Sequence, residues 1–266
     1  MRRLVIAFVA VFSLVSLSAC TDDTPESGSR SGSTEAVGED RGVELAEDDF
    51  VEEISSAQLE AGTVQVTTTT SIGGQELVLE GYSALAKDPD EKAAVLSMDV
   101  SALGMAGDEP MDLRMVDQKV YVNLGETTDG KFYRVDLAQE DDPMGAELAG
   151  MLEQADPLRQ FEVLGAAATE ISSEGDGGEI DGVATTRYVL SVDPAAMYEA
   201  QGFGVDEGMP EAFDYILYVG VDHLPRRMEI EVPGAGTSTV EWSEWGQDVV
   251  IDVPDDDQIT DEAPAA

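Results

Sequence analysis

Short runs in which apolar and polar residues alternate occupy much of this chain. The segment MDLRM at residues 111–115, for example, is apolar at every second position. A period of two places the apolar side chains on one face of a β-strand. Pairs such as Gly73-Gly74 and Asp129-Gly130 separate the runs and are typical of turns between antiparallel strands. The alternation therefore predicts an antiparallel sheet with one apolar face.

The middle of the chain changes to a helical period. Asp142-Pro143 and Asp156-Pro157 each place an N-cap residue before a proline, which is typical of helix starts. Further helices are expected over residues 49–61 and after Asp193-Pro194. Strands return after Thr169.

These patterns predict an α+β fold. They give about eleven strands and at least four helices, and the last strand is expected to contain Val249 and Ile251. The strand–helix–strand alternation that builds a parallel sheet is not seen in the sequence. A curved antiparallel sheet that such narrow helical stripes cover in part can enclose an apolar cavity.

The N-terminus has the features of a secretory signal. Arg2 and Arg3 precede an apolar run over residues 4–15, and the segment LSAC that ends at Cys20 matches a lipobox. Cleavage before Cys20 exposes its thiol for attachment of a diacylglyceryl group. The apolar run is shorter than the ~20 residues that a membrane-spanning helix needs. We therefore expect a lipoprotein that Cys20 anchors to the outer face of the cytoplasmic membrane, in the cell envelope; a secreted, non-acylated form is the alternative.

Composition divides the chain into four parts. Residues 1–19 are the expected signal peptide, and residues 20–46 are the lipidated Cys20 and a small, polar, acidic stretch typical of a disordered tether. The folded domain is expected over residues 47–254. An acidic C-terminal tail over residues 255–266 completes the chain.

The net charge excludes one class of function. With 14 Lys and Arg against 56 Asp and Glu, the chain carries a charge of -42 at pH 7. Such a charge repels nucleic acids and anionic lipid surfaces. We attribute the acidity to solubility in a salty habitat, where salt screens the self-repulsion; a partner with a basic face is the alternative.

Catalytic motifs are not found in the sequence. His223 is the single histidine, and it lies in a predicted turn. The spacings of a nucleophile elbow, a zinc site or a phosphate-binding loop do not occur. The acidic clusters at residues 141–142, 176–182 and 255–257 lack the alternating ligands of a calcium loop. We therefore expect no enzymatic activity, no metal and no cofactor.

Methionines are concentrated in one part of the chain. Nine follow the start residue, and six of these lie between Met98 and Met151. Their unbranched, adaptable side chains suit the wall of a cavity that accepts varied apolar ligands. Methionine at strand and helix spacing also suits an ordinary core, so both interpretations stay open.

Several segments together resemble a known family. In chain order they are GTVQVTTTT, GGQELVLEGYSAL, MDLRMVDQKVYVNLGE, GKFYRVDL, IDGVATTRYVLSVD, VDHLPRRMEIEVPG and TVEWSEWGQDVVIDVPDDDQI. With the lipobox, and over roughly residues 57–259, they resemble the mycobacterial LppX/LprA/LprF/LprG lipoproteins, among which the LprG type is the most similar.

The resemblance implies a fold, a ligand and a partner. The fold is a strongly curved antiparallel half-barrel, similar to the LolA lipoprotein carrier, with helices on its concave face. The ligand is the set of acyl chains of a glycolipid or triacylglycerol, held in a large apolar cavity and transferred across the envelope. The partner is a major-facilitator lipid exporter. An envelope interaction or sensor lipoprotein with a filled core and no lipid cargo is the alternative.

The apolar pattern also identifies residues for this site. The expected concave wall consists of Leu96, Met98, Leu113, Met115, Val120 and Val122. The expected helical gate consists of Leu148, Met151 and Leu152. Arg226 and Arg227 follow a turn, where they either contact an anionic lipid headgroup or are ordinary surface charges beside carboxylates.

Overall fold

The computed structural model describes residues 44–99, 110–137, 152, 156–200, 212–232 and 236–260. Within these residues the chain forms one twelve-stranded, open sheet in the order β12-β6-β5-β4-β3-β2-β1-β11-β10-β9-β8-β7. The strands are β1 (Thr63–Ile72), β2 (Gln75–Ala84), β3 (Ala93–Met98), β4 (Met111–Val116), β5 (Lys119–Asn123), β6 (Phe132–Asp136), β7 (Ala168–Ile180), β8 (Val183–Val192), β9 (Phe213–Gly220), β10 (Pro225–Val232), β11 (Gly236–Ser243) and β12 (Ile259–Thr260).

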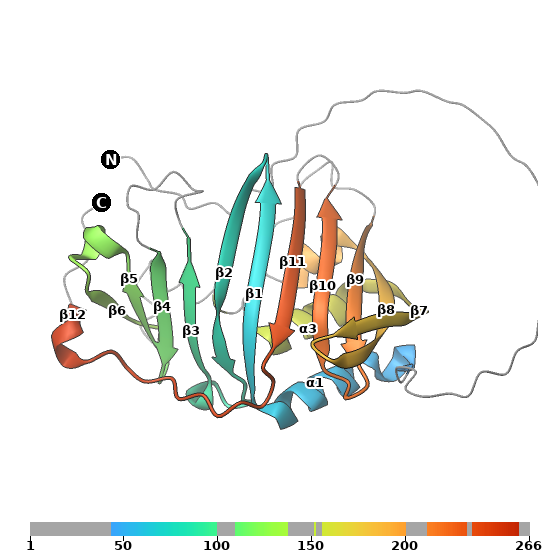
Figure 1. Cartoon of the computed structure of the whole chain (residues 1–266), viewed down its shortest axis with the longest axis horizontal. Coiled ribbons are helices and arrows are strands. Elements are labelled where there is room, and N and C mark those ends of the chain that lie inside the picture. The colour runs from blue at the N-terminus through green and yellow to red at the C-terminus, as the bar shows by residue number, and fades with distance from the viewer. Residues whose placement is uncertain are drawn as a thin grey trace, which may run out of the picture.

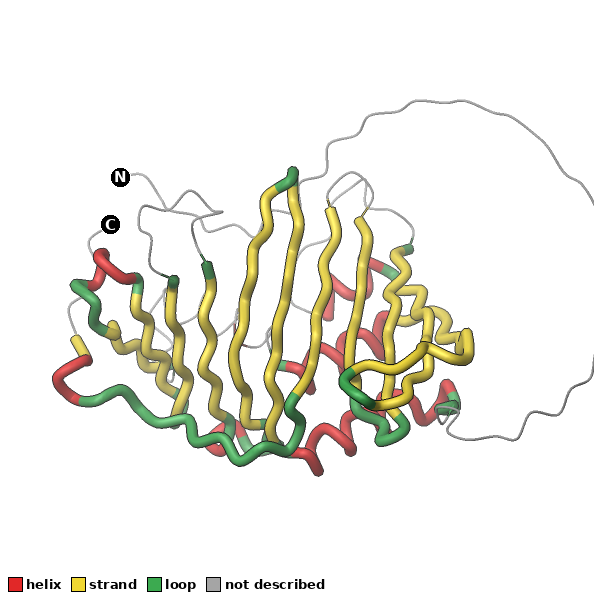
Figure 2. The backbone as a smooth tube through the Cα atoms, viewed as in Figure 1, coloured by secondary structure: helices red, strands yellow, loops and turns green. Residues whose placement is uncertain are grey.

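The sheet is mostly antiparallel and curved, which confirms the expected fold class. Only the pairing of β12 with β6 is parallel. The helices lie on one side of the sheet, behind it in Figures 1 and 2, and we call the sheet face on that side the inner face. The described helices are α1 (Phe50–Ala61), α3 (Pro157–Ala167) and α4 (Pro194–Ala200), with short 3-10 turns η1 (Glu47–Asp49), η2 (Pro89–Glu91), η4 (Gly125–Thr128) and η5 (Asp256–Gln258).

The sequence signals for the helices act as expected. The Asp156 side chain accepts a hydrogen bond from the Leu158 backbone N–H at 2.9 Å and so caps α3. Asp193 does the same for Ala195 at the start of α4, also at 2.9 Å. Gly62 ends α1 with φ +75°, a left-handed conformation that glycine adopts without strain. The helix expected after Asp142-Pro143 lies outside the described residues except for Leu152, which is helical.

The C-terminal segment differs from expectation. The strand expected at Val249 and Ile251 does not form, because residues 247–255 run across the ends of the strands rather than beside one (Figure 2). This segment is held by Thr63, whose carbonyl accepts from the Gly246 N–H at 3.0 Å and whose hydroxyl donates to the Gln247 carbonyl at 2.6 Å.

The domain also extends past its expected end at residue 254. Asp256–Gln258 form η5, and Ile259–Thr260 pair with Phe132 and Tyr133 of β6. Part of the segment expected as a tail is therefore a strand of the sheet. A two-residue strand has no alternation for a sequence pattern to reveal. Residues 1–43 lie outside the described residues. The tether expected to end at residue 46 ends earlier, because Leu45 is buried in the fold and its N–H donates to the Tyr188 hydroxyl at 2.7 Å.

Two apolar clusters fill the inner side of the sheet. The first, which we call the aromatic core, packs α1 and α3 against β1 and β7–β11 and includes Phe50, Phe161, Tyr188, Tyr215 and Trp242. The second, which we call the aliphatic cluster, joins β3–β6 and consists of Ala94, Leu96, Leu113, Val120, Val122, Val135 and Leu152. The sheet thus carries one cluster under its helices and another toward the β12 edge.

Candidate functional site

The strand register places the whole expected wall on the inner face. Directly paired residues of neighbouring strands lie on the same face of a sheet. Leu96 pairs with Leu113, which in turn pairs with Val122. Two further pairs, Met98 with Met111 and Met115 with Val120, place the remaining wall residues on the same face. All six expected wall residues therefore share one face of three adjacent strands.

Burial brings most of this wall into one cluster. Leu96, Leu113, Val120 and Val122 are members of the aliphatic cluster, and Met115 is half-buried against it. Met98 is buried on the same face but outside the cluster. Sequence reasoning omitted Ala94 and Val135, which the register also places on this face. The alternation along each strand could have identified them, because the neighbours of both residues are polar or face outward.

The expected gate is described at one residue. Leu152 is buried and packs in the aliphatic cluster. A helical residue from the middle of the chain therefore packs against the wall. Leu148 and Met151 lie outside the described residues, so their role as a gate stays a prediction.

Gly81 lies between the two clusters. On the inner face it pairs with Val66 of the aromatic core on one side and with Leu96 of the aliphatic cluster on the other. A Cβ built on Gly81 would lie 1.9 Å from the Val95 carbonyl oxygen and 2.8 Å from the Leu96 Cα. Only glycine allows β2 and β3 to approach this closely, and strand interiors tolerate it where another backbone comes near.

The two arginines lie on β10, away from the aliphatic cluster. Arg226 is buried at a bulge where β10 begins, and its guanidinium donates to Asp222 in the preceding turn. Arg227 faces outward and donates to Glu241 of β11 at 2.8 Å. Both side chains therefore have carboxylate partners within the protein, and neither adjoins the expected wall. Their contact with a headgroup stays a prediction.

The tyrosines with raised pKa values lie outside the aliphatic cluster. Burial raises the pKa of Tyr215 in the aromatic core to about 12. Burial also raises the pKa of Tyr121, which pairs with Arg114 and Arg134 on the outer face. Among the described residues, no group of three His, Cys, Asp or Glu side chains is placed to hold a metal ion. The lone His223 lies 3.1 Å from Glu53 of α1 through its Nδ1.

The wall itself is an apolar surface. Its members have no ionisable side chain, and the aromatic residue that packs against them is Tyr133, which is half-buried. This arrangement can exclude water and contact hydrocarbon. No helix in the described part of the chain has the length and apolar character needed to cross a bilayer.

Comparison with known proteins finds a similarity in the fold. No family model matches this sequence, and no curated protein matches it. Among solved structures, LprF from Mycobacterium bovis matches with a TM-score of 0.51 and 16% identity, over 78% of this chain and 96% of that chain. The lipoprotein LppX from Mycobacterium tuberculosis matches with a TM-score of 0.49 and 16% identity, over 78% and 100%. The chain thus shares the LprF fold.

Proposed function

We propose that this protein is a lipid-anchored envelope protein that holds the acyl chains of a glycolipid or triacylglycerol against the aliphatic cluster and carries them across the envelope. The observation that carries the proposal is the inner face of β3–β6, where wall residues of aliphatic and methionine type gather apart from the aromatic core. Cys20 would supply the anchor, and residues 21–43 the tether that keeps the carrier near its donor membrane. The LprF-like fold and the lipobox support this assignment.

The physical need for such a carrier follows from the hydrophobic effect. Each methylene exposed to water costs ~0.8 kcal/mol, so two tails of ~16 carbons cost roughly 25 kcal/mol. Desorption from a bilayer is slow for that reason. An apolar wall that receives the tails before they meet water removes most of this barrier, and no catalytic group is needed. We therefore propose a non-enzymatic role.

The resemblance to the LprG type supports two finer points of the proposal. The functional counterpart of this chain is then an LprG-like carrier, and its partner is a major-facilitator lipid exporter. Both points rest on the sequence segments quoted above. Co-purification with a membrane exporter from the native host would support the partner, and recovery of the lipoprotein alone after cross-linking would contradict it.

A second candidate function is an envelope interaction protein with a filled interior. The full burial of Val120 and Val135, at 0% and 1% exposure, favours this alternative, because close packing leaves less room for a ligand. Native mass spectrometry of the protein from its own host separates the two functions. A carrier retains lipid, and a filled protein has the mass of the polypeptide and its anchor alone.

One substitution tests the wall directly. Val122→Trp adds a large side chain to the inner face. We expect it to lower the amount of retained lipid by about half or more, because the indole occupies space that an acyl chain would fill. Val116→Trp is the matched control, because Val116 is half-buried on the outer face of β4. Equal lipid content in both variants, with unchanged melting temperatures, would show that the wall is assigned wrongly.

A further inference from the structure

Over β1–β6 and β9–β11, the inner face of the sheet is almost free of charge. The register of β1–β6 and β9–β11 places Val, Leu, Ile, Met, Ala, Gly, Ser, Thr, Gln and aromatic residues at the inward positions. Within these described strands the charged residue that does not face outward is Arg226, which is buried at the β10 bulge and bound to Asp222. The face that meets a ligand therefore offers no free cation in the described residues.

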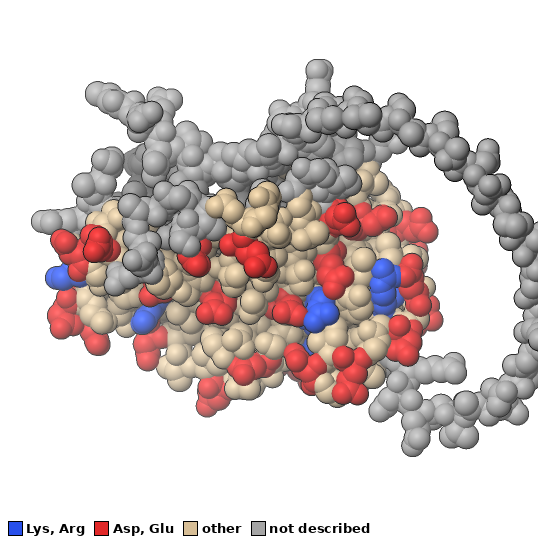
Figure 3. All heavy atoms as spheres, turned by 45° about the horizontal axis from the view of Figure 1, so that its top comes forward, with Lys and Arg blue, Asp and Glu red and all other residues tan. Residues whose placement is uncertain are grey.

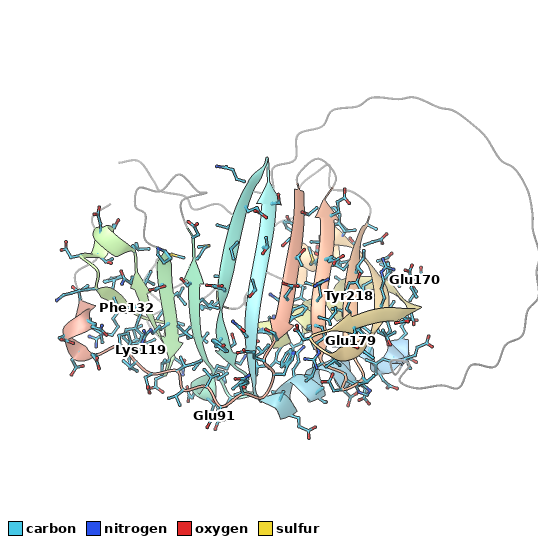
Figure 4. The ribbon with its side chains drawn as sticks, viewed as in Figure 1. Glu91, Lys119, Phe132, Glu170, Glu179 and Tyr218 are labelled. Atoms are coloured by element: carbon cyan, nitrogen blue, oxygen red, sulfur yellow. The ribbon has the colours of Figure 1, made fainter. Side chains whose placement is uncertain are left out.

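The other strand cations point away from this face. Arg114, Lys119 and Arg134 alternate with the inward residues of β4, β5 and β6 and so lie on the outer face. Lys119 is labelled in Figure 4, toward the β12 end of the sheet. Arg114 lies over the Phe132 ring, 5.0 Å from its centroid. These charges are separated from the inner face by the sheet itself.

A strip of hydroxyl groups crosses the middle of the inner face. Thr68 pairs with Leu79 and with Val240, which puts it on the inner side of β1. Thr70 lies two residues further on the same face, and its hydroxyl lies 3.1 Å from the Ser238 hydroxyl of β11. We call Thr68, Thr70 and Ser238 the hydroxyl strip. All three are half-buried and uncharged, and β1 is the strand of the aromatic core that lies nearest to the aliphatic cluster.

The net charge of the chain opposes the approach of anions. The chain has a net charge of -42, and Figure 3 shows Asp and Glu spread over the visible surface with few Lys or Arg among them. A cleft-bearing protein with a strong single-sign field raises the local concentration of opposite charges and lowers that of like charges. An anionic headgroup that approaches the inner face is repelled and finds no described cation to pair with, which is costly for a desolvated charge.

We propose that the inner face selects lipids with an uncharged headgroup, whose hydroxyl and ester oxygens contact the hydroxyl strip. This inference rests on the proposed function and names its substrate class. Hydroxyls both donate and accept hydrogen bonds, so they satisfy sugar or glycerol-ester oxygens without requiring a charge. Phosphate, in contrast, is usually held by Arg or Lys.

The experiment compares two lipids with the same tails. Phosphatidylcholine vesicles carry a trace of dioleoyl monogalactosylglycerol or of dioleoyl phosphatidylglycerol, and the full chain is separated from them and its lipid measured. We expect about tenfold more galactolipid than phosphatidylglycerol at about 0.01 M salt, where the screening length is ~30 Å. At about 1 M salt the screening length is ~3 Å, and the ratio of bound galactolipid to bound phosphatidylglycerol should fall.

Paired variants locate the effect on the inner face. Thr70→Lys places a cation on the hydroxyl strip, and we expect it to raise phosphatidylglycerol uptake about threefold or more. Thr69→Lys adds the same charge on the outer face of the same strand, and we expect no such gain. Ser238→Lys and its outer neighbour Thr239→Lys form a second pair on β11, in case Thr70→Lys does not fold.

Each outcome decides between the claims. A neutral preference that only the inner lysines weaken supports the inference. Equal uptake of both lipids by the unmodified chain, or the same gain from inner and outer lysines, overturns it and leaves the carrier role standing. Uptake of neither lipid by the folded chain overturns the carrier role, and this inference with it.

Discussion

The aromatic core and the aliphatic cluster lie on the same face of one sheet, but different side chains fill them. In the aromatic core, Phe50 meets Tyr188 edge to face with centroids 4.9 Å apart, and Phe161 lies 5.6 Å from Trp242. Rings bury a large area with few rotatable bonds. The aliphatic cluster, in its described residues, is built from Ala, Val and Leu, with half-buried Met111, Met115 and Tyr133 against it.

Because different side chains fill the two clusters, the same sheet can both stabilise the fold and present an adaptable apolar surface. The aromatic core anchors helices α1 and α3, and the start of the described chain is tied to it where the Leu45 N–H donates to the Tyr188 hydroxyl at 2.7 Å. The unbranched methionine side chains, here Met111 and Met115, adapt their shape to an irregular ligand. We infer that the aromatic core supplies stability and that the aliphatic cluster supplies the adaptable surface.

The largest expected contrast comes from truncating one residue in each cluster. Trp242→Ala should lower the free energy of unfolding by about 3–5 kcal/mol, because the fully buried indole leaves a cavity. Val122→Ala should cost about 1–2 kcal/mol, since it removes two methyl groups. Urea denaturation followed by circular dichroism measures both. Equal losses would erase the proposed division between the clusters.

Gly81 tests the connection between the clusters. Gly81→Ala should destabilise the protein by about 3 kcal/mol, because its Cβ meets the Val95 backbone rather than a side chain that can move. Ser83→Ala, on the same face of β2, is the control and should cost less than about 1 kcal/mol. A tolerated alanine at position 81, seen in the same denaturation assay, would contradict the close approach of β2 and β3.

Alkaline pH should affect the aromatic core through Tyr215. Its folded pKa of about 12 lies above the ordinary value of 10.0 because the ring is buried. The unfolded chain therefore loses this proton first, and stability falls as pH rises from 10 to 12, by about 2 kcal/mol in total. Tyr215→Phe should remove that part of the loss. If the stability of Tyr215→Phe falls with pH as steeply as that of the unmodified protein, the Tyr215 hydroxyl is not the source of the loss.

The ion pair between Lys92 and Asp156 gives the smallest expected effect. It connects the chain just before β3 to the N-cap of α3, and so joins the two regions. Asp156→Ala should cost about 1 kcal/mol, mostly from the lost cap. Lys92→Met should cost less than about 0.5 kcal/mol, as part-exposed pairs contribute little. Thermal melting of both variants checks the order, and a larger loss in Lys92→Met would reverse the interpretation.

Local patterns predicted most of the strands and the described helices. The alternation around Met111–Met115 fixes which residues share a face, so the six wall residues could be chosen before any register was known. The Asp-Pro starts at residues 156 and 193 placed α3 and α4 within a residue. Both signals depend on the backbone of a few consecutive residues.

Long-range geometry was beyond the sequence. The separation of two clusters depends on how β2 and β3 approach at Gly81, which no local period encodes. The alternation at Val249 and Ile251 suggested a strand, yet this segment has no neighbouring strand, and Val250 between them is 75% exposed. The pairing of β12 with β6 brings together residues more than a hundred positions apart.

The most direct test of the central claim is to map where a lipid tail lies. A fatty acyl chain with a terminal photoreactive group, loaded into the full chain and activated, marks the residues that it touches. We expect cross-links in peptides of β3–β6, including Leu96, Leu113 or Val122. Cross-links confined to the peptides of Phe161 and Trp242 in the aromatic core, or to the outer face of the sheet, would contradict it.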